Sequence, residues 1–206
     1  MKKVTLLVVM LAFIANIAMA QNKERVNAFN YNKNAQSYIT TAEQLMVQNR
    51  IDKAEKQMGF AKIELGRAKT SIDLAAAHDE TKNDAKTWHY YGVIYLKIAT
   101  YTEFKEIDPE ALTKCADAFR KLVELDETYF KNNYGEIITY IQSITTNYFN
   151  QGALAYEAGD YAKAIECYKQ AYNTMAIIGQ KDNEALLVAA QIAVMAKEYN
   201  SAVELC

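Results

Sequence analysis

Small residues and tyrosines recur at helical spacing late in the chain, and this arrangement restricts the fold more than any other feature of the sequence. Gly152 and Ala164 lack bulk, so they would let two antiparallel helices approach closely. Gly159 and Asp160 stand between these helices, where glycine accepts a left-handed turn and aspartate can cap the next helix. Tyr168 would fill the space between this helix pair and its neighbour. The segment therefore predicts two closely packed helices.

Helical periodicity also dominates the rest of the chain. The sequence has one proline and seven glycines, so few residues interrupt helices. No sustained polar–apolar alternation and no Asn-Gly turn indicates strands. Asp52, Asp84 and Asp108 stand at expected helix N-caps, with Pro109 suited to the first turn after Asp108. The expected helices cover about 35–46, 52–77, 84–102, 108–125, 130–157, 161–176, 183–195 and 199 onward.

Three segments resemble tetratricopeptide repeats (TPRs). Around Gly152 the small residues and tyrosines fall at the spacing of the family. The first segment, from Trp88, is similar to the W-x2-L-G-x2-Y opening, with tyrosine in place of leucine, and its second half has Cys and Leu where alanine is usual. A third copy begins near Asn183, because Ala190 follows Gly152 by 38 residues. The resemblance assigns to repeat packing Trp88, Tyr91, Gly92, Tyr95, Cys115, Phe119, Gly152, Gly159, Tyr161, Ala164, Tyr168, Ala171 and Ala202.

The resemblance implies an all-α fold, a TPR-like solenoid of antiparallel helix pairs wound into a right-handed superhelix. Residues 85–206 would form the repeats, and 35–84 an N-terminal helical pair that is a degenerate repeat. The first match departs from the pattern, since Trp88 and Cys115 are 27 residues apart whereas Tyr148 and Ala164 are 16 apart. Cys206 falls inside the second helix of the third copy. We therefore expect a truncated last repeat and hypothesise that the chain is an N-terminal fragment of a longer protein.

The first twenty residues have the layout of a secretory signal peptide. A short basic start, Met1 to Lys3, precedes an almost wholly apolar run over 4–17, and Ala18-Met19-Ala20 is a small-x-small cleavage pattern. The alternative is an uncleaved membrane anchor, but the apolar run is shorter than the roughly 20 residues that span a bilayer. We expect cleavage after Ala20, a periplasmic or secreted product without an integral membrane segment, and a flexible leader over 21–34.

The charge balance argues against a nucleic-acid partner. The whole chain has a formal charge of −2, and removal of Lys2 and Lys3 with the signal peptide would make it more negative. Nucleic-acid binding requires a basic face. Export would permit a disulfide, but Cys115 and Cys167 also suit small core positions on helices. The cysteines and the two histidines lack the spacing of a zinc site, so we expect no metal and no cofactor.

No catalytic motif appears in the sequence. The chain has no G-x-S-x-G, H-E-x-x-H, P-loop or G-x-G-x-x-G pattern. His89 could serve as a base, but no nucleophile or carboxylate stands at a legible spacing from it. Glu103, Glu106 and Glu110 cluster near an expected turn, and a solvated charged turn explains them. We therefore predict a protein that is not an enzyme.

The resemblance to TPR proteins also implies where a partner binds. In that family the first helix of each pair lines a concave groove, which suits a peptide or a helix. The lysine and asparagine clamp that some TPR domains use for a C-terminal carboxylate is absent, since His89, Val93, Phe149 and Ala153 occupy its places. The groove residues carried over by spacing are Lys86, His89, Val93, Leu96, Lys97, Phe149, Ala153, Tyr156, Glu157, Leu187 and Gln191, with Thr146, Glu184 and Val194 beside them.

Two functions follow as hypotheses. In the first, the chain resembles exported TPR proteins of Gram-negative bacteria and is an adaptor that binds a protein or peptide within an envelope assembly, including one associated with the outer membrane. In the second, the repeats are an accessory module of a larger envelope enzyme or a transport or secretion component. A catalytic or barrel domain downstream would favour the second hypothesis.

Overall fold

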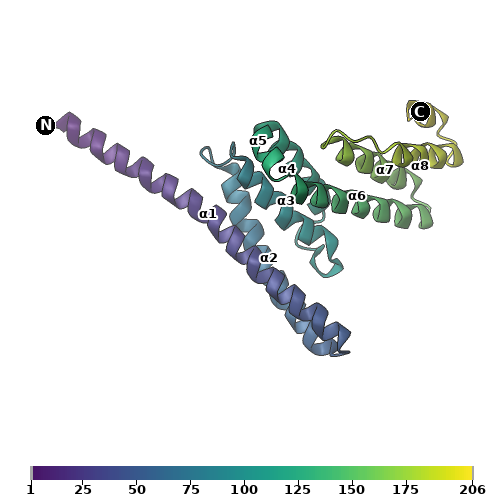
Figure 1. Ribbon diagram of the computed structural model, residues 1–206, viewed down its shortest axis with the longest axis horizontal. Coiled ribbons are helices and arrows are strands. Elements are labelled where there is room, and N and C mark those ends of the chain that lie inside the picture. Colours follow the sequence, from purple (N-terminus) through teal and green to yellow (C-terminus); the bar gives the residue numbers. More distant parts are fainter. Residues whose placement is uncertain (1, 206) are drawn as a thin grey trace. The chain divides into compact units, whose positions relative to one another are not determined.

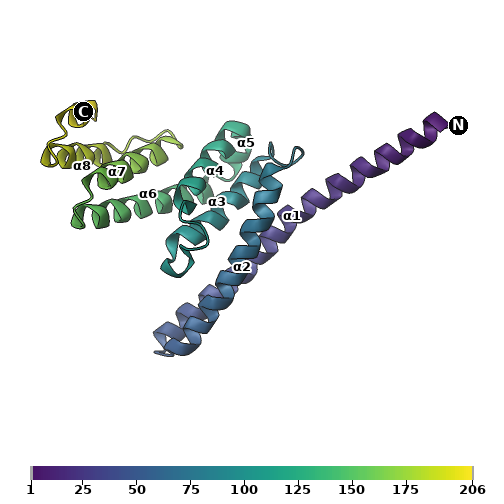
Figure 2. The same cartoon turned by 180° about the vertical axis from the view of Figure 1, so that it is seen from behind.

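The computed structural model describes the backbone of residues 2–205 and the side chains of residues 22–205. All regular secondary structure in this part of the chain is helical (Figures 1 and 2). The chain divides into two compact units, Met1–Asp108 and Pro109–Cys206, which we describe separately. The expected all-α fold is therefore confirmed for the described residues.

Unit 1 is built on a long helical hairpin. Helix α1 (Lys2–Val47) turns at Gln48–Arg50 and returns as α2 (Ile51–Ala77), against which α3 (Ala85–Thr100) and the short 3-10 helix η1 (Thr102–Phe104) pack. Figure 1 shows α1 and α2 running antiparallel along each other. Asn49 has a φ of 56° in the turn, a conformation that asparagine tolerates better than most residues.

Alanines at seven-residue spacing line the inside of this hairpin. Helix α2 buries alanine at every seventh position from Ala54 to Ala75, with Met58, Leu65 and Ile72 between them. On α1, alanine recurs with the same period. Because alanine has a single methyl group, the two backbones can approach closely along the whole contact. The fully buried alanines are Ala28, Ala35, Ala42, Ala54, Ala61, Ala68 and Ala75.

Ala68→Leu should therefore lower the free energy of unfolding of unit 1 by about 1–3 kcal/mol, because it forces extra methylenes into a filled contact. Gly66→Ala is the matched control: a Cβ at position 66 meets nothing within 4 Å, so the substitution should stabilise the helix by up to ~1 kcal/mol. Urea denaturation followed by the fluorescence of Trp88, the single tryptophan, measures both. Equal stabilities of the two variants would contradict the close-contact interpretation.

The expected flexible leader over 21–34 is instead part of α1. Ala28 is fully buried, and the guanidinium of Arg25 forms an ion pair with Asp84 on the approach to α3. The ring of Phe29 lies 5.3 Å from that of Tyr90. Asparagine- and lysine-rich composition suggested a loop, but one buried alanine and these contacts hold the segment in a helix. The proposed signal peptide, residues 1–20, lies outside the side chains that the structure describes.

Of the four expected N-caps, two are wrong. Asp84 caps α3 as predicted, since its carboxylate accepts from the Lys86 N–H at 2.9 Å. Asp52 lies within the first turn of α2, whose N-cap is Arg50. Asp108 is buried, and its carboxylate lies 3.5 Å from the amine of Lys69. The N-cap position of α4 is occupied by Glu110, two residues after Asp108.

A polar network that includes Lys69 and Asp73 on α2 and Tyr95 on α3 joins the two helices. The amine of Lys69 lies 2.9 Å from the carboxylate of Asp73, which in turn accepts a hydrogen bond of 2.7 Å from the hydroxyl of Tyr95. Hydrogen bonds and charge from Asp73 and Asp108 outweigh burial and raise the pKa of the Lys69 amine. The ring of Tyr95 stacks on that of Tyr91 with 4.3 Å between the centroids. These contacts orient the predicted packing face of α3 toward α2.

Unit 2 contains α4 (Ala111–Leu125), α5 (Glu127–Asn132), α6 (Tyr134–Glu157), α7 (Tyr161–Ala176), α8 (Asn183–Met195) and α9 (Tyr199–Glu204). Helix α4 packs on α6, α6 on α7, α7 on α8, and α8 on α9. The single helix expected over 130–157 is interrupted at Asn133, whose side-chain amide bonds back to the Tyr129 carbonyl at 2.8 Å. The two halves of the first predicted repeat, α3 and α4, fall in different units, so their pairing stays a prediction.

Candidate protein-binding surface

Helices α6 and α7 form the closely packed pair that the small residues predicted. Gly152 faces the ring of Tyr168 so closely that a Cβ at position 152 would lie 2.9 Å from a ring carbon. Ala164 and Ala171 are fully buried on the opposing helix. Asp160 caps α7 by accepting from the Lys163 N–H at 3.1 Å. The local structure of this repeat is therefore the one that its sequence specifies.

The turn between α8 and α9 repeats the turn between α6 and α7 with a shift of 38 residues. Helices α6 and α8 end at Glu157 and Met195, and α7 and α9 begin at Tyr161 and Tyr199. One hydrophobic cluster joins the two pairs, and the assignment of α8 and α9 to a third repeat stays a prediction. The cluster consists of Ala155, Ala164, Ile165, Tyr168, Ala189, Ile192, Ala193 and Ala202, with Phe149, Val188 and Leu205 against it.

The two pairs differ at the turn after their first helix. Gly159 and Lys197 occupy equivalent positions and both adopt positive φ, 77° and 63°. A side chain at such φ is strained by about 1–2 kcal/mol, partly offset in glycine by greater freedom of the unfolded chain. Lys197→Gly should therefore stabilise unit 2 by about 0.5–1 kcal/mol. The reverse change, Gly159→Lys, should destabilise unit 2 by a similar amount. Urea denaturation followed by circular dichroism measures both variants.

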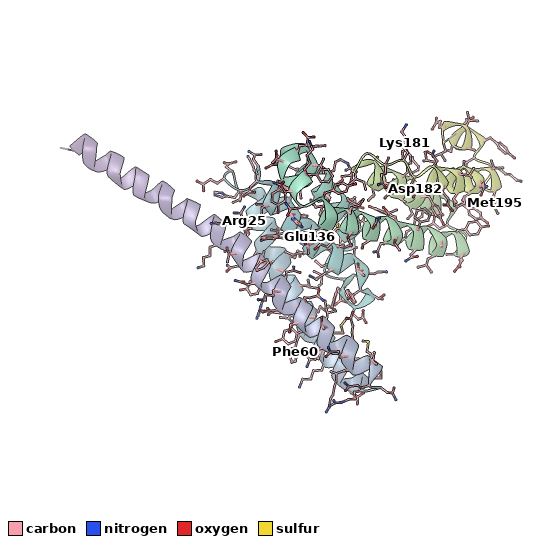
Figure 3. The ribbon with its side chains drawn as sticks, viewed as in Figure 1. Arg25, Phe60, Glu136, Lys181, Asp182 and Met195 are labelled. Carbon is pink, nitrogen blue, oxygen red and sulfur yellow. The ribbon has the colours of Figure 1, made fainter. Side chains whose placement is uncertain are left out.

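The exposed side of α6 and α8 forms one surface of unit 2. Tyr156 on α6 reaches Met195 on α8, with 3.7 Å between the hydroxyl oxygen and Sδ. Leu187, Val194 and Met195 are each more than half exposed, and Figure 3 shows Met195 near the end of α8. We call this surface the α6–α8 face, and it consists of Phe149, Ala153, Tyr156, Glu157, Leu187, Gln191, Val194 and Met195.

Most groove residues predicted on α6 and α8 belong to this face by its definition, and their role in binding a partner stays a prediction. Ala153, Glu157 and Gln191 are exposed, as are Tyr156 and Leu187. Phe149 is half-buried, because its ring packs edge-on against Tyr168 with 5.3 Å between centroids. Met195 was missed by the sequence reasoning, although it follows Val194 directly and its helical position places it beside the end of α6.

The predicted groove residues on α3 have a different environment. His89 is 5 % exposed and Leu96 is 8 % exposed, so these two are not available to a partner as predicted. The amine of Lys97 donates to the Asn32 side chain on α1 at 2.8 Å, and Val93 is half-buried. Lys86 remains exposed. The expectation that this whole set faces outward is therefore wrong, and at Lys97 the reason is that α1 lies against α3.

One signal in the sequence indicates that α1 extends far enough upstream to lie against α3. Alanine recurs every seven residues at positions 28, 35 and 42, which continues the hairpin contact upstream of the expected helix start. Burial against α1 lowers the pKa of the Lys97 amine from 10.5 to about 8. Lys97 thus belongs to the interior of unit 1 and not to an exposed binding surface.

One predicted packing residue is also more exposed than expected. Tyr161 is 36 % exposed, and its ring lies 5.8 Å from that of Tyr156. It therefore extends the aromatic part of the α6–α8 face at the turn between α6 and α7. Among the other predicted packing residues, Tyr95, Cys115, Phe119 and Tyr168 are buried, whereas Trp88 and Tyr91 are half-buried.

Comparison with known proteins supports the repeat assignment. Residues 146–174 match the family model for the tetratricopeptide repeat. No curated protein matches the chain. Taken with the helix pairs of unit 2, this match defines the chain as an all-α protein with a TPR-like helical-repeat fold. Repeats of this family are scaffolds for protein–protein interaction and are not catalytic.

Metal-binding clusters and membrane-spanning helices are both absent from the residues that the structure describes. Within that part of the chain, no cluster of His, Cys, Asp or Glu side chains could hold a metal ion. No helix among the described residues is both long enough and apolar enough to cross a membrane. Both described cysteines, Cys115 and Cys167, are buried thiols, and burial raises the pKa of each.

Proposed function

We propose that the chain is an adaptor of the bacterial cell envelope that binds a segment of another protein on the α6–α8 face. The observation that carries the proposal is the exposure of Leu187, Val194 and Met195 beside Tyr156 on one side of a TPR. Aromatic and apolar side chains held on rigid helices are the usual anchors of protein interfaces. The signal-peptide pattern over 1–20 supports the envelope location.

The surface fits an extended peptide or a helix better than a small molecule. Its apolar side chains stand along two helices and not around an enclosed cavity, and a helix or peptide laid along them contacts anchors at three- and four-residue intervals. Binding there leaves the core of the repeat intact, because the hydrophobic cluster consists of buried residues and Phe149 packs against it.

Site-specific photo-crosslinking in envelope fractions tests the location of the binding surface. A crosslinker at Leu187 or Val194 should form a discrete adduct with a partner, whereas the same group at Glu166 or Lys169, exposed on α7, should not. The double variant Leu187→Ser/Val194→Ser should lose an adduct formed from Tyr156. Adducts of equal yield from α7, or an unchanged yield in the double variant, would refute the assignment.

The envelope location has a separate test. The mature N-terminus of the exported chain should be Gln21, as read by N-terminal sequencing after fractionation. A protein that keeps Met1 and is recovered only with the cytoplasm would contradict the proposed location while leaving the binding surface untouched.

A further inference from the structure

Charge is distributed unequally between the helices of unit 2. The sequences of α6 and α8 contain Glu136, Glu157 and Glu184 but no lysine, arginine or histidine. The basic residues of the unit's helices lie on the other elements, as with Arg120 on α4 and Lys163 on α7. The two helices that supply the α6–α8 face therefore present carboxylates without cations.

The cations closest in sequence lie outside these helices. Lys181 precedes α8 and Lys197 follows it. Figure 3 shows the side chain of Lys181 extending away from α6, next to Asp182. Asp182 caps α8 by accepting from the Ala185 N–H at 3.2 Å. Neither lysine forms an ion pair with Glu157 or Glu184 within the described part of the chain.

The two carboxylates bracket the apolar part of the face. Glu184 lies in the first turn of α8, and Glu157 ends α6 beside the Tyr156–Met195 contact at the far end of α8. Positions 184 and 195 are eleven residues apart in one helix, which corresponds to about 16 Å. Leu187, Gln191 and Val194 occupy the interval.

The position of Glu157 is unfavourable for its own helix. It is the last residue of α6, where the helix dipole disfavours a negative side chain. No ion pair to Glu157 occurs among the described residues, and the residue is exposed. Glu184 stands at the favourable end of α8, yet it too has no ion-pair partner in that part of the chain. Both carboxylates are thus available to a positive charge from outside.

We propose that the α6–α8 face selects a cationic amphipathic segment, with apolar side chains in its middle and lysine or arginine toward its ends. This inference rests on the proposed function and names the chemistry of the partner. The apolar anchors contact Tyr156, Leu187 and Val194, while the terminal cations lie near Glu157 and Glu184. An acidic segment with the same apolar residues is repelled at both ends, and this repulsion supplies specificity.

Two synthetic helical peptides test the proposal. They share leucines at i, i+3, i+4 and i+7, and their polar positions are all lysine in one peptide and all glutamate in the other. Fluorescence anisotropy with the full chain should give an affinity about tenfold higher for the lysine peptide at low salt, because exposed ion pairs contribute modestly and additively. Raising the salt concentration should narrow the difference.

Variants separate local recognition from the net charge of the chain. Glu157→Gln/Glu184→Gln should weaken binding of the lysine peptide about fivefold. The matched control, Glu166→Gln/Glu204→Gln, changes net charge equally at exposed sites on α7 and α9 and should leave the affinity within twofold. Equal weakening by both double variants would overturn the proposal, as would equal affinity for the two peptides or no measurable binding of either.

Failure of this inference is distinguishable from failure of the proposed function. Photo-crosslinks from Leu187 and Val194 to a partner, together with no preference for the lysine peptide, would leave the binding surface in place and remove the charge selection. Absence of the crosslinks would remove the surface itself.

Discussion

Gly152→Val should lower the free energy of unfolding of unit 2 by about 3 kcal/mol, toward the upper end for overpacking a filled interior. A Cβ at position 152 already approaches the Tyr168 ring to 2.9 Å, and valine adds two methyl groups to it. The ring cannot retreat easily, because it is buried in the cluster with Ala164 and Ile165. Urea denaturation monitored by circular dichroism measures the effect.

Gly135 provides the matched control on the same helix. A Cβ at position 135 meets nothing within 4 Å, so Gly135→Val should change stability by less than about 0.5 kcal/mol. The pair Gly152→Val/Tyr168→Leu should be less destabilised than the sum of its single variants, because the smaller side chain makes room. Strict additivity, or equal effects of valine at the two glycines, would contradict the interpretation of Gly152 as the contact point between α6 and α7.

Lys97→Met should stabilise unit 1 at neutral pH, by about 1–3 kcal/mol after allowance for partial exposure. The substitution keeps much of the side chain's apolar stem and removes a charge that burial disfavours. A shift of one pKa unit corresponds to 1.36 kcal/mol, and burial lowers the pKa of Lys97 from 10.5 to about 8. Loss of the 2.8 Å hydrogen bond to Asn32 reduces the gain.

The sign of the pH dependence follows from proton binding. Between about pH 8 and 10.5 the unfolded chain holds a proton on Lys97 that the folded chain has released, so the stability of the wild type rises with pH across this window. The methionine variant lacks this rise. Its advantage should therefore be full below pH 8 and should disappear above pH 10.5, as measured by Trp88 fluorescence in urea.

Lys86→Met is the control for this experiment, because Lys86 lies exposed at the start of the same helix. Its effect should stay within about 0.5 kcal/mol at every pH. A Lys97→Met variant less stable than the wild type at pH 7 would show that the amine makes a favourable contact, and Lys97 would return to the candidates for partner binding.

Sequence patterns alone determined the helices of the repeat and most of the α6–α8 face. Gly152, Ala164 and Tyr168 are placed by local spacing, because residues three, four and seven apart lie on one side of a helix whatever surrounds it. The turn at Gly159 and the cap at Asp160 are equally local. For the same reason the candidate residues on α6 and α8 emerged on one surface without knowledge of the fold.

Tertiary structure alone decided which of the predicted surfaces stay open. Lys97 is half-buried because Asn32 of α1, 65 residues away in sequence, lies against it, while His89 and Leu96 are buried, and helical spacing on α3 carries no record of such neighbours. Asp108 likewise became a partner of Lys69, because a carboxylate bonds to whichever donor packing brings to it. Local sequence specifies which side of a helix is apolar, whereas burial depends on the segments that fold against it.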